Sequence, residues 1–524
     1  MLTLSVPSID PAVSRTAESR PKAVSTWLGR LPFASPLESA QQLVTALYAL
    51  NRSPLDEAAR YTLMQLYRPV VARVCSSLEV LLAGSGVPPR AQQRQFGVLL
   101  RELQIEHSIG YKHLLLTQIS PRSDRVNTRL LAEITTRLMA ALRDIQTACH
   151  LTRTLITPGL WQEMHALHAY AQTTHLSGST ADGMPASSLA YRQALLIALA
   201  DPPRMSHAEI TFTRHVLDQF GGLAQLCSAP VAMHRGFVIQ TEGDVAPSHH
   251  APDRRPGRFW LDTEALCFQL HETILELRGG TSPRRVGLPP EMDGEFSLVT
   301  CMRLFKQWSS GAARTYKRYP TPGRPVQTVA GVSAIHRLLE KAVQANRPNS
   351  VEADHHQIHI IEPSFAGTAA ASTAQWISSN DSAVGLALSG TPDAPLNLKV
   401  GDALAVRGGD ETEWSLGVIR WTRMRDARQV ECGVERLSPT IQPAWVRPLR
   451  GGKLAEPALF VPGLAALRQN DRLLLPHHLY QIGMDAEVRH EHHRYMLTFG
   501  RRFEYTPSFD LIDFTIFADL PLTP

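Results

Sequence analysis

The residues best suited to binding a ligand lie in the segment from Gln375 to Leu388, QWISSNDSAVGLAL. At its centre, Asn380, Ser382 and Gly385 form the pattern Asn-x-Ser-x-x-Gly between two apolar runs that are typical of strands. Asn and Ser carry short polar side chains that bond to nearby backbone groups or to a ligand. A glycine can adopt the positive φ that a Cβ would penalise. We therefore predict a tight turn at which Asn380 and Ser382 face a ligand and Gly385 has a left-handed backbone.

Three further strand-like segments follow this turn. They are Val400 to Asp402, Gly417 to Trp421 and Glu431 to Glu435. A polar turn followed by segments of this kind resembles the PilZ domain, a β-barrel with which bacteria bind cyclic di-GMP. The resemblance extends from Thr373 to about Ser438. It rests on the order of all four features, because a six-residue motif alone is weakly specific.

PilZ domains carry a second motif, Arg-x-x-x-Arg, in the loop that leads into the first barrel strand. The family spacing is broken here, because no arginine lies between Arg347 and Asn380. Farther upstream, Arg314 and Arg318 have the required spacing and precede the strand-like run from Val326 to Val332. The resemblance therefore implies that Arg314 and Arg318 bind the ligand, provided that an insertion separates this strand from the next.

An insertion over residues 333–372 fits the composition of that region. The segment from Ser333 to Ala345 predicts a short helix. The segment from His355 to Ser372 is polar and rich in histidine, with a Gly, Ala, Ser and Thr run typical of loops. The predicted PilZ-like β-barrel then runs from residue 312 to residue 440 and includes this insertion.

The chemistry of the ligand agrees with these residue types. Cyclic di-GMP has two phosphates and two guanines. An arginine fork pairs with phosphate oxygens or with guanine O6 and N7, and its planar face stacks on a base. The alternative is a chance match, because the chain is rich in arginine throughout. Another pair, Arg423 and Arg425, is better explained as a solvated strand face.

Length, charge and cysteine content limit the other function classes. The 524 residues predict about three or four domains. The net charge of +5 permits an anionic ligand, but no basic block or stripe predicts a nucleic-acid polymer as partner. The six cysteines show no Cys-x-x-Cys spacing, which favours reduced, mostly buried thiols in a cytoplasmic protein. No signal-peptide pattern is visible, and no apolar run reaches the roughly 18 to 20 residues that span a bilayer.

The chain before the barrel predicts mostly helices. Residues 1–35 are rich in Pro, Ser and Arg, and we interpret them as a flexible tail. Residues 37–228 predict an α-helical interaction domain, in which Ser53 followed by Pro54 marks a helix start. The expected helices are Ser39 to Asn51, Leu55 to Leu82, Ala91 to Thr117, Ser123 to Ile156, Trp161 to Thr174, Ser188 to Ala200 and Ser206 to Leu226.

Two further regions contain short strand-like runs. Residues 231–311 predict a mixed α/β connecting region, and residues 441–524 predict a C-terminal β-extension that forms a partial barrel. The strands expected in this extension are Ala458 to Pro462, Arg472 to Pro476, Ala486 to Arg489 and Arg494 to Thr498. The predicted fold class is α+β, with an N-terminal all-α helical bundle, a PilZ-like antiparallel β-barrel and a small C-terminal β-unit.

Histidines raise the alternative of a metal hydrolase. They are grouped at 355–359, 477–478 and 490–493, and Glu163, His165 and His168 share a predicted helix. The helical group does not match His-Glu-x-x-His, and a metal site needs ligands that converge on one point. We interpret these histidines as solvated or locally hydrogen-bonded, and we predict no metal site.

No motif predicts an enzyme. The chain has no phosphate-binding P-loop, no nucleophile elbow and no dinucleotide fingerprint. Glu106 and His107, near Tyr111, are better explained as a helix surface than as an acid–base pair. We therefore predict a protein without catalytic residues or cofactors, whose ligand is cyclic di-GMP.

The resemblance implies a cytoplasmic cyclic di-GMP effector. It is similar to the atypical PilZ receptors, including the FimW type, which are associated with type IV pili, motility, surface attachment and biofilms. The helical domain would bind a protein partner, which could recruit the chain to the cell pole or the inner membrane. The alternative is a degenerate PilZ-fold adaptor that no longer binds nucleotide. The broken arginine motif favours the adaptor, and the intact turn favours the receptor.

Overall fold

The computed structural model describes residues 2–120, 127–176, 186–229, 237–248, 258–309, 319–345, 373–382, 384–391, 397–409, 411–426, 428–450, 454–464 and 468–521. The chain forms two compact units. The helical unit comprises Met1–Ser85 and Pro89–Arg314, and the barrel unit comprises Gly86–Pro88 and Thr315–Pro524.

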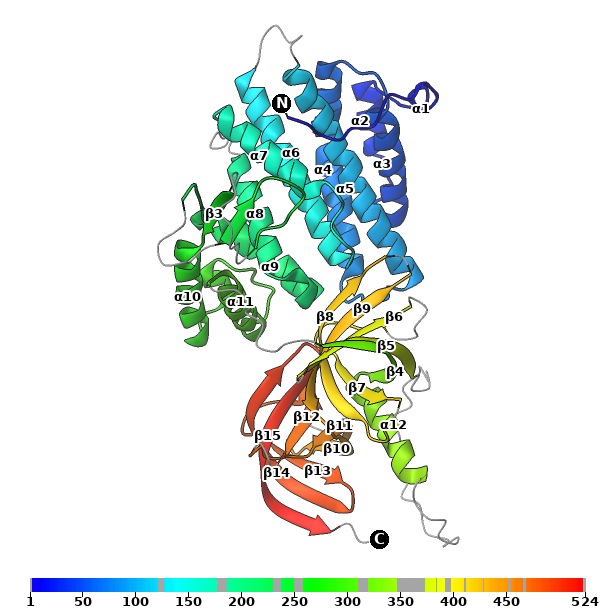
Figure 1. Ribbon diagram of the computed structural model, residues 1–524, viewed down its shortest axis with the longest axis vertical. Helices are drawn as coiled ribbons and strands as arrows, with labels where there is room; N and C mark the ends of the chain where they lie inside the picture. Colours follow the sequence, from blue (N-terminus) through cyan, green and yellow to red (C-terminus); the bar gives the residue numbers. More distant parts are fainter. Residues whose placement is uncertain are drawn as a thin grey trace. The chain divides into compact units, whose positions relative to one another are not determined.

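The helical unit is built mainly from α-helices. They are α1 (Pro11–Ser14), α2 (Pro21–Leu28), α3 (Pro36–Asn51), α4 (Glu57–Leu82), α5 (Ala91–Gln118), α6 (Thr128–Leu151), α7 (Leu160–Thr173), α8 (Ser187–Leu199), α9 (His207–Phe220), α10 (Glu264–Arg278) and α11 (Gly294–Ser309). Three of the longest, α4, α5 and α6, lie side by side (Figure 1). A small antiparallel sheet has the order β1 (Gln225–Cys227), β3 (Arg258–Asp262), β2 (Phe237–Gln240). Because β1 follows α9, the predicted helix ends before Leu226.

Capping residues explain where two of these helices begin. Helix α4 begins after Asp56, whose Oδ1 accepts a hydrogen bond from the N–H of Ala59 at 2.8 Å. It therefore starts later than the predicted position, Pro54. Helix α9 begins after Ser206, as predicted, and Ser206 and Glu209 form a reciprocal capping box.

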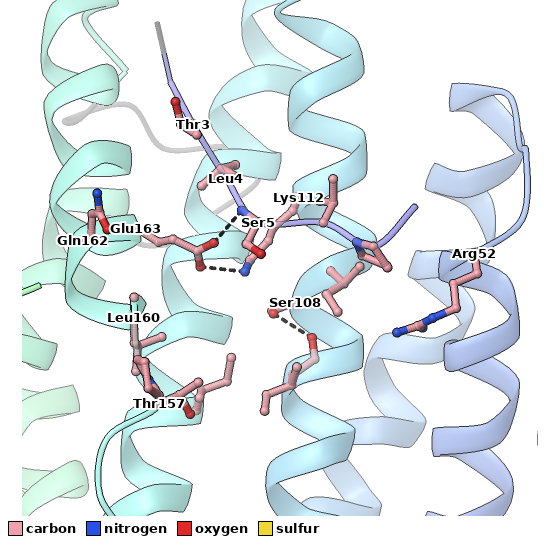
Figure 2. Close-up of a pocket in the computed structure, with 17 residues that line it drawn as sticks. Thr3, Leu4, Ser5, Arg52, Ser108, Lys112, Thr157, Leu160, Gln162 and Glu163 are labelled. Atoms are coloured by element: carbon pink, nitrogen blue, oxygen red, sulfur yellow. Dashed lines mark hydrogen bonds and ion pairs between the residues drawn. The ribbon is translucent and has the colours of Figure 1, made fainter. Parts of the chain in front are cut away.

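Residues 2–35 pack against the helices, so the predicted flexible tail is wrong. The side chain of Leu4 is buried in the core of the helical unit. The backbone N–H of Ser5 donates to Glu163 Oε1 at 2.8 Å, and Lys112 Nζ lies 2.6 Å from Glu163 Oε2 (Figure 2). The composition was misleading because a few apolar side chains suffice to anchor a segment along a groove between helices.

The predicted connecting region, residues 231–311, contributes to the core of the helical unit. Leu261 of β3, Leu270 of α10 and Trp308 of α11 are fully buried in the same apolar cluster as the long helices. The indole Nε1 of Trp308 donates to the carbonyl oxygen of Leu196 in α8 at 3.0 Å. The region is thus part of one compact unit with the preceding helices.

The first half of the barrel unit is a closed antiparallel barrel, called here the first barrel. Its neighbouring strands follow the order β4-β5-β6-β9-β8-β7. The strands are β4 (Tyr319–Ala330), β5 (Ala374–Ser382), β6 (Gly385–Gly390), β7 (Ala403–Gly408), β8 (Ser415–Met424) and β9 (Val430–Ser438). Each strand contributes a buried side chain to the barrel interior: Val326, Trp376, Leu388, Leu404, Ile419 and Val434. Helix α12 (Val332–Ala345) lies between β4 and β5 in the chain, where the sequence predicts a helix. The rest of the predicted insertion, 346–372, lies outside the described residues.

The C-terminal region forms a second closed barrel rather than the predicted partial one. Its strands follow the order β10-β11-β12-β15-β14-β13. They are β10 (Gln442–Pro448), β11 (Glu456–Val461), β12 (Arg472–Pro476), β13 (Asp485–His490), β14 (His493–Tyr505) and β15 (Phe509–Pro521). The sequence missed β10 and β15, and β15 closes the sheet by pairing with both β12 and β14. The predicted α+β class, with helices, a PilZ-like barrel and a C-terminal β-unit, is confirmed.

The two barrels and α12 share an apolar cluster within the barrel unit. Its members come from both barrels and from the helix: Val329, Ile335, Leu416, Val418, Leu459, Leu474 and Phe509. Two polar contacts add to it. Ser508 Oγ donates to Asp402 Oδ1 at 2.6 Å, and Trp445 Nε1 donates to Glu340 Oε1 at 2.7 Å. The outer face of the first barrel is therefore partly covered by the second.

Glu487, in the second barrel, is a buried carboxylate held by three arginines. Its side chain is 1% exposed, and the Nε atoms of Arg489 and Arg494 each lie 2.9 Å from its Oε1. Arg447 bonds to Oε2. Burial opposes ionisation, but the bonds from the guanidinium groups lower the pKa of Glu487 from 4.5 to about 2. The ionised carboxylate therefore stabilises the fold above the unfolded-state pKa, and this stabilisation is lost as the pH falls through the folded-state pKa.

We expect Glu487 to contribute up to about 3 kcal/mol of stability at neutral pH that disappears in acid, since each unit of pKa shift corresponds to about 1.4 kcal/mol. Urea unfolding at a series of pH values between neutral and strongly acid measures this. Glu487→Gln should flatten the acid part of the curve. Glu456→Gln, which alters a carboxylate that is 38% exposed, is the matched control. Equal acid slopes for the Glu487→Gln variant and the parent chain would contradict the assignment.

Two whole-chain expectations can be compared with the described residues. Among the residues that the structure describes, no helix combines the length and the apolar character that a bilayer span requires. All six cysteines are free, and each except Cys227 is buried, as predicted.

Candidate functional site

The Asn-x-Ser-x-x-Gly pattern forms the hairpin between β5 and β6, called here the polar turn (Asn380–Gly385). Ser382 faces Gly385 in the strand register, and Ser382 Oγ donates to the Gly385 carbonyl oxygen at 3.1 Å. The N–H of Ser382 donates to Asp381 Oδ1 at 2.7 Å. Asn380 and Ser382 are half-buried. The predicted strand–turn–strand arrangement is confirmed, whereas the binding role of its side chains stays a prediction.

Gly385 does not have the predicted left-handed backbone. Its φ is outside the positive range that other glycines adopt, such as Gly401 at φ +93°. A Cβ on Gly385 would lie 3.3 Å from the carbonyl oxygen of Val434 and 3.5 Å from Ser382 Oγ. The close approach of β9 and of the serine hydroxyl therefore explains the glycine better than backbone strain does.

Arg314 and Arg318 lie outside the described residues. The register of the adjoining strand is nevertheless informative, because β4 begins at Tyr319, the residue directly after Arg318 in the sequence. Tyr319 faces Asp381 and Pro320 faces Asn380 across the β4–β5 pair. The chain thus enters the first barrel beside the polar turn.

A row of facing residues crosses the first barrel from the polar turn to β8. Asn380 faces Ala387 on β6, Ala387 faces Gly433 on β9, and Gly433 faces Trp421 on β8. Facing residues share one side of a sheet, and the neighbours of Ala387 along β6 point into the barrel interior, so this row lies on the outer face. We call it the outer row (Asn380, Ala387, Gly433, Trp421).

The indole of Trp421 lies directly over Gly433. A Cβ at Gly433 would be 2.5 Å from Trp421 Cδ1 and would overlap Nε1 even more closely. Sequence reasoning singled out neither residue for the site. A glycine in the middle of a strand marks such close approach, so Gly433 carried a usable signal.

The carboxylates beside the polar turn are paired with arginines. Asp381 Oδ2 lies 3.1 Å from Arg436 NH2. Glu435, which faces Gly385 in the register, lies 2.5 Å from Arg420 Nε. Arg420 also forms a forked pair with Glu504 of the second barrel, at 2.7 and 2.9 Å. Burial disfavours its charge, but Glu504 and Glu435 raise the pKa of Arg420 above its ordinary value. This pairing reduces the repulsion that the carboxylates would exert on an anionic ligand.

Arg423 is exposed on β8, as predicted, whereas Arg425 is exposed directly after the end of that strand. Their side chains are 44% and 61% exposed, and both pair with Glu431. They are therefore already engaged and are largely in contact with solvent.

The histidines of α7 are core residues rather than solvated ones. His165 Nδ1 lies 2.7 Å from the hydroxyl of Tyr191, and His165 Nε2 lies 2.8 Å from the Val245 carbonyl oxygen. His168 is buried and stacks on Tyr191 with ring centroids 4.2 Å apart. Within the part of the chain that the structure describes, no group of three His, Cys, Asp or Glu residues could hold a metal ion. The histidines at 355–359 lie outside that part.

Glu106 and His107 are buried, so the prediction of a helix surface is wrong. Glu106 accepts a hydrogen bond from Asn51 Nδ2 at 2.8 Å and pairs with Arg52 at 3.2 Å. His107 packs edge-on against Tyr111, with ring centroids 5.2 Å apart. Both faces of α5 are therefore covered here by neighbouring parts of the helical unit.

Comparison with known proteins matches three family descriptions in chain order. Residues 22–230 match "Cyclic-di-GMP receptor FimW, N-terminal domain", residues 341–443 match "Cyclic-di-GMP receptor FimW, middle PilZ domain", and residues 444–517 match "FimW C-terminal beta-barrel domain". The Cyclic-di-GMP receptor FimW of Pseudomonas aeruginosa is 24% identical over 580 residues, covering 98% of this chain and 93% of that protein. No solved structure matches the chain.

The three matches agree with the observed architecture. The first covers helices α2 to α9, the second contains the polar turn and the outer row, and the third covers most of the second barrel. The second match begins after β4, so it does not extend to Arg314 and Arg318. The matched regions, their order and the closed first barrel together show that the chain belongs to the FimW-like family of PilZ-domain proteins.

Proposed function

We propose that this chain is a cyclic di-GMP-binding effector whose ligand binds at the polar turn and at Arg314 and Arg318. The register of β4 against β5 carries the proposal. Because Tyr319 faces Asp381, the Arg-x-x-x-Arg segment joins the barrel next to the polar turn, although the two motifs are far apart in the sequence. The name of the Pseudomonas aeruginosa relative, a cyclic-di-GMP receptor, supports the same ligand.

The outer row suits a guanine nucleotide. Asn380 and Ser382 offer hydrogen-bonding groups at one end, and Trp421 offers an aromatic face at the other. Gly433 has no side chain, so the Trp421 indole can lie over it, and the outward side of that indole is the surface on which a base would stack. Stacking of a base on an aromatic ring contributes about 1 to 3 kcal/mol. Arg314 and Arg318 would supply forks for phosphate oxygens or for guanine O6 and N7.

The output that we propose is control of surface-associated behaviour, namely type IV pili, motility and attachment, without catalysis. The helical unit is the proposed binding surface for a protein partner, in a cytoplasmic protein that the partner recruits to the cell pole or the inner membrane. This part rests on the resemblance to the FimW type. Pull-downs with the full chain, with and without cyclic di-GMP, test it, and a partner set that is indifferent to nucleotide contradicts it.

Calorimetric titration of the full chain tests the ligand. We expect binding of cyclic di-GMP but not of cyclic di-AMP or GTP, because the site is proposed to read two guanines and two phosphates together. Ser382→Ala should weaken binding about five-fold, since a hydrogen bond contributes about 1 kcal/mol, and it should leave the melting temperature nearly unchanged.

The matched control for this variant is Ser415→Ala. Ser415 lies on β8 of the same barrel, and its hydroxyl also donates to a carbonyl, that of Val406, at 2.9 Å. Ser415 is not part of the polar turn, so the loss of its hydroxyl should not affect the affinity for cyclic di-GMP. Failure of the parent chain to bind cyclic di-GMP would favour the alternative, a PilZ-fold adaptor without nucleotide.

A further inference from the structure

A cavity of about 470 Å³ lies within the helical unit, between helices α4, α5, α6, α8 and α9. Part of its wall consists of small apolar side chains: Ala72, Ala140, Ala141 and Ala190. The rest is polar and rich in arginine. The cavity therefore combines room for a small organic molecule with groups that could orient it.

Two side chains in this wall are more than nine-tenths buried and lack a hydrogen-bond partner. They are His107, at Nε2, with 8% exposure, and Tyr111, at its hydroxyl, with 1% exposure. Arg137 adds two more unpartnered groups, Nε and NH1, because only its NH2 reaches Glu133, at 2.5 Å from Oε1. Buried polar groups in folded proteins are normally paired. Four unpaired atoms belong to residues of this one wall, and a bound molecule would account for them.

The unpaired atoms share a chemical character. The guanidinium and the phenol donate hydrogen bonds. Burial lowers the pKa of His107 to about 4, so its imidazole is neutral and Nε2 can carry a proton. Arg68, in the same wall, adds a positive charge. The complementary ligand is therefore a cluster of acceptor oxygens.

The acidic residues of the wall are already engaged. Asp144 Oδ1 accepts from Arg143 Nε and NH2, at 3.1 and 2.9 Å. Asp218 Oδ1 accepts from Gln193 Nε2 at 3.2 Å. Their charge is partly offset, as that of Arg137 is by Glu133, but Nε and NH1 of Arg137 have no acceptor.

We infer that this cavity is a binding site for a small organic oxyanion, whose phosphate or carboxylate oxygens accept hydrogen bonds from Arg137, Tyr111 and His107. The site is independent of the nucleotide site proposed on the first barrel, because it uses different residues in the other unit. It would let a second small molecule act on the helices that are proposed to bind the protein partner.

Titration of the full chain with inorganic phosphate, GMP and benzoate, followed by saturation-transfer NMR and calorimetry, tests the inference. Phosphate and GMP supply phosphate oxygens, and benzoate supplies carboxylate oxygens. We expect at least one probe to bind saturably at millimolar concentration or below. Tyr111→Phe should weaken that binding about five-fold, and Arg137→Gln about ten-fold or more, because bonds from charged donors are the stronger.

The matched control is Tyr191→Phe. The Tyr191 hydroxyl is also buried, but it bonds to His165 and does not line the cavity. Tyr191→Phe should lower the melting temperature and leave probe binding unchanged. Tyr111→Phe should weaken probe binding and leave the melting temperature unchanged. Cyclic di-GMP affinity should be the same in all three variants. If no probe binds the parent chain, or if Tyr111→Phe and Arg137→Gln bind as well as it does, the cavity is a water-filled structural space and the inference is overturned.

Discussion

Replacing Arg318 with alanine is expected to weaken cyclic di-GMP binding by about ten-fold or more, and replacing Arg314 and Arg318 together by about a hundred-fold. Each guanidinium fork to a guanine edge or a phosphate contributes roughly 1 to 3 kcal/mol, and about 1.4 kcal/mol corresponds to ten-fold in affinity. Calorimetric titration of the full chain measures both changes. The fold should survive, because the Arg-x-x-x-Arg segment precedes β4 rather than forming part of it.

Arg425→Ala is the control for the arginine variants. Arg425 belongs to the same barrel, is 61% exposed and pairs with Glu431, so its loss removes one positive charge without touching the polar turn. If the replaced arginines acted only by general electrostatic attraction, all of these variants would lose the same affinity for cyclic di-GMP. That loss would become smaller at high salt. Unchanged affinity in the double variant would exclude the arginine pair and leave Arg324, an exposed residue of β4, as the next candidate.

The barrel around the polar turn could be predicted because its signals are local. A short polar turn between two apolar runs specifies a hairpin by itself, and β5 and β6 form it. The same holds for β9, in which Val430, Cys432 and Val434 occupy every second position. Helix α12 likewise carries its own periodicity, so its existence between two strands could be predicted without knowing the barrel.

Strands that depend on distant partners were missed. Strand β10 contains Pro443 and Pro448, and proline argues against a strand when only the sequence is considered. It forms because β11 and β13 pair with it on either side. Strand β15 likewise forms because it pairs with β12 and β14. Closure of the second barrel is a property of these pairings, which no single window of sequence contains.

The burial of polar side chains was also hidden from the sequence. His107 and Tyr111 have the spacing of an ordinary polar helix face, and their burial follows only from the packing of α3, α4 and α6 around α5. The outer row is a similar case, because Asn380 and Trp421 are aligned on one face only by the pairing of the two strands between them. Sequence reasoning found the turn at one end of the row, since only that end is encoded locally.

Gly433→Val is expected to lower cyclic di-GMP affinity by about ten-fold or more and to cost about 1 to 3 kcal/mol of stability. The new side chain would occupy the space of the Trp421 indole, which must then leave the sheet. Overpacking of this kind costs 1 to 3 kcal/mol, and loss of the stacking surface costs a similar amount in binding. Calorimetry and urea unfolding of the full chain measure the two effects.

Trp421→Ala and the double variant separate these causes. If Gly433→Val acts by displacing the indole, Trp421→Ala alone should lower affinity equally, and the double variant should bind no worse than either single one. Gly385→Ala is the comparison for stability, because a Cβ there meets its nearest atom at 3.3 Å and φ is not strained. It should cost less stability than Gly433→Val. Additive losses of affinity in the double variant would show that Gly433 and Trp421 act separately, and the outer row would then not be a single binding surface for the nucleotide.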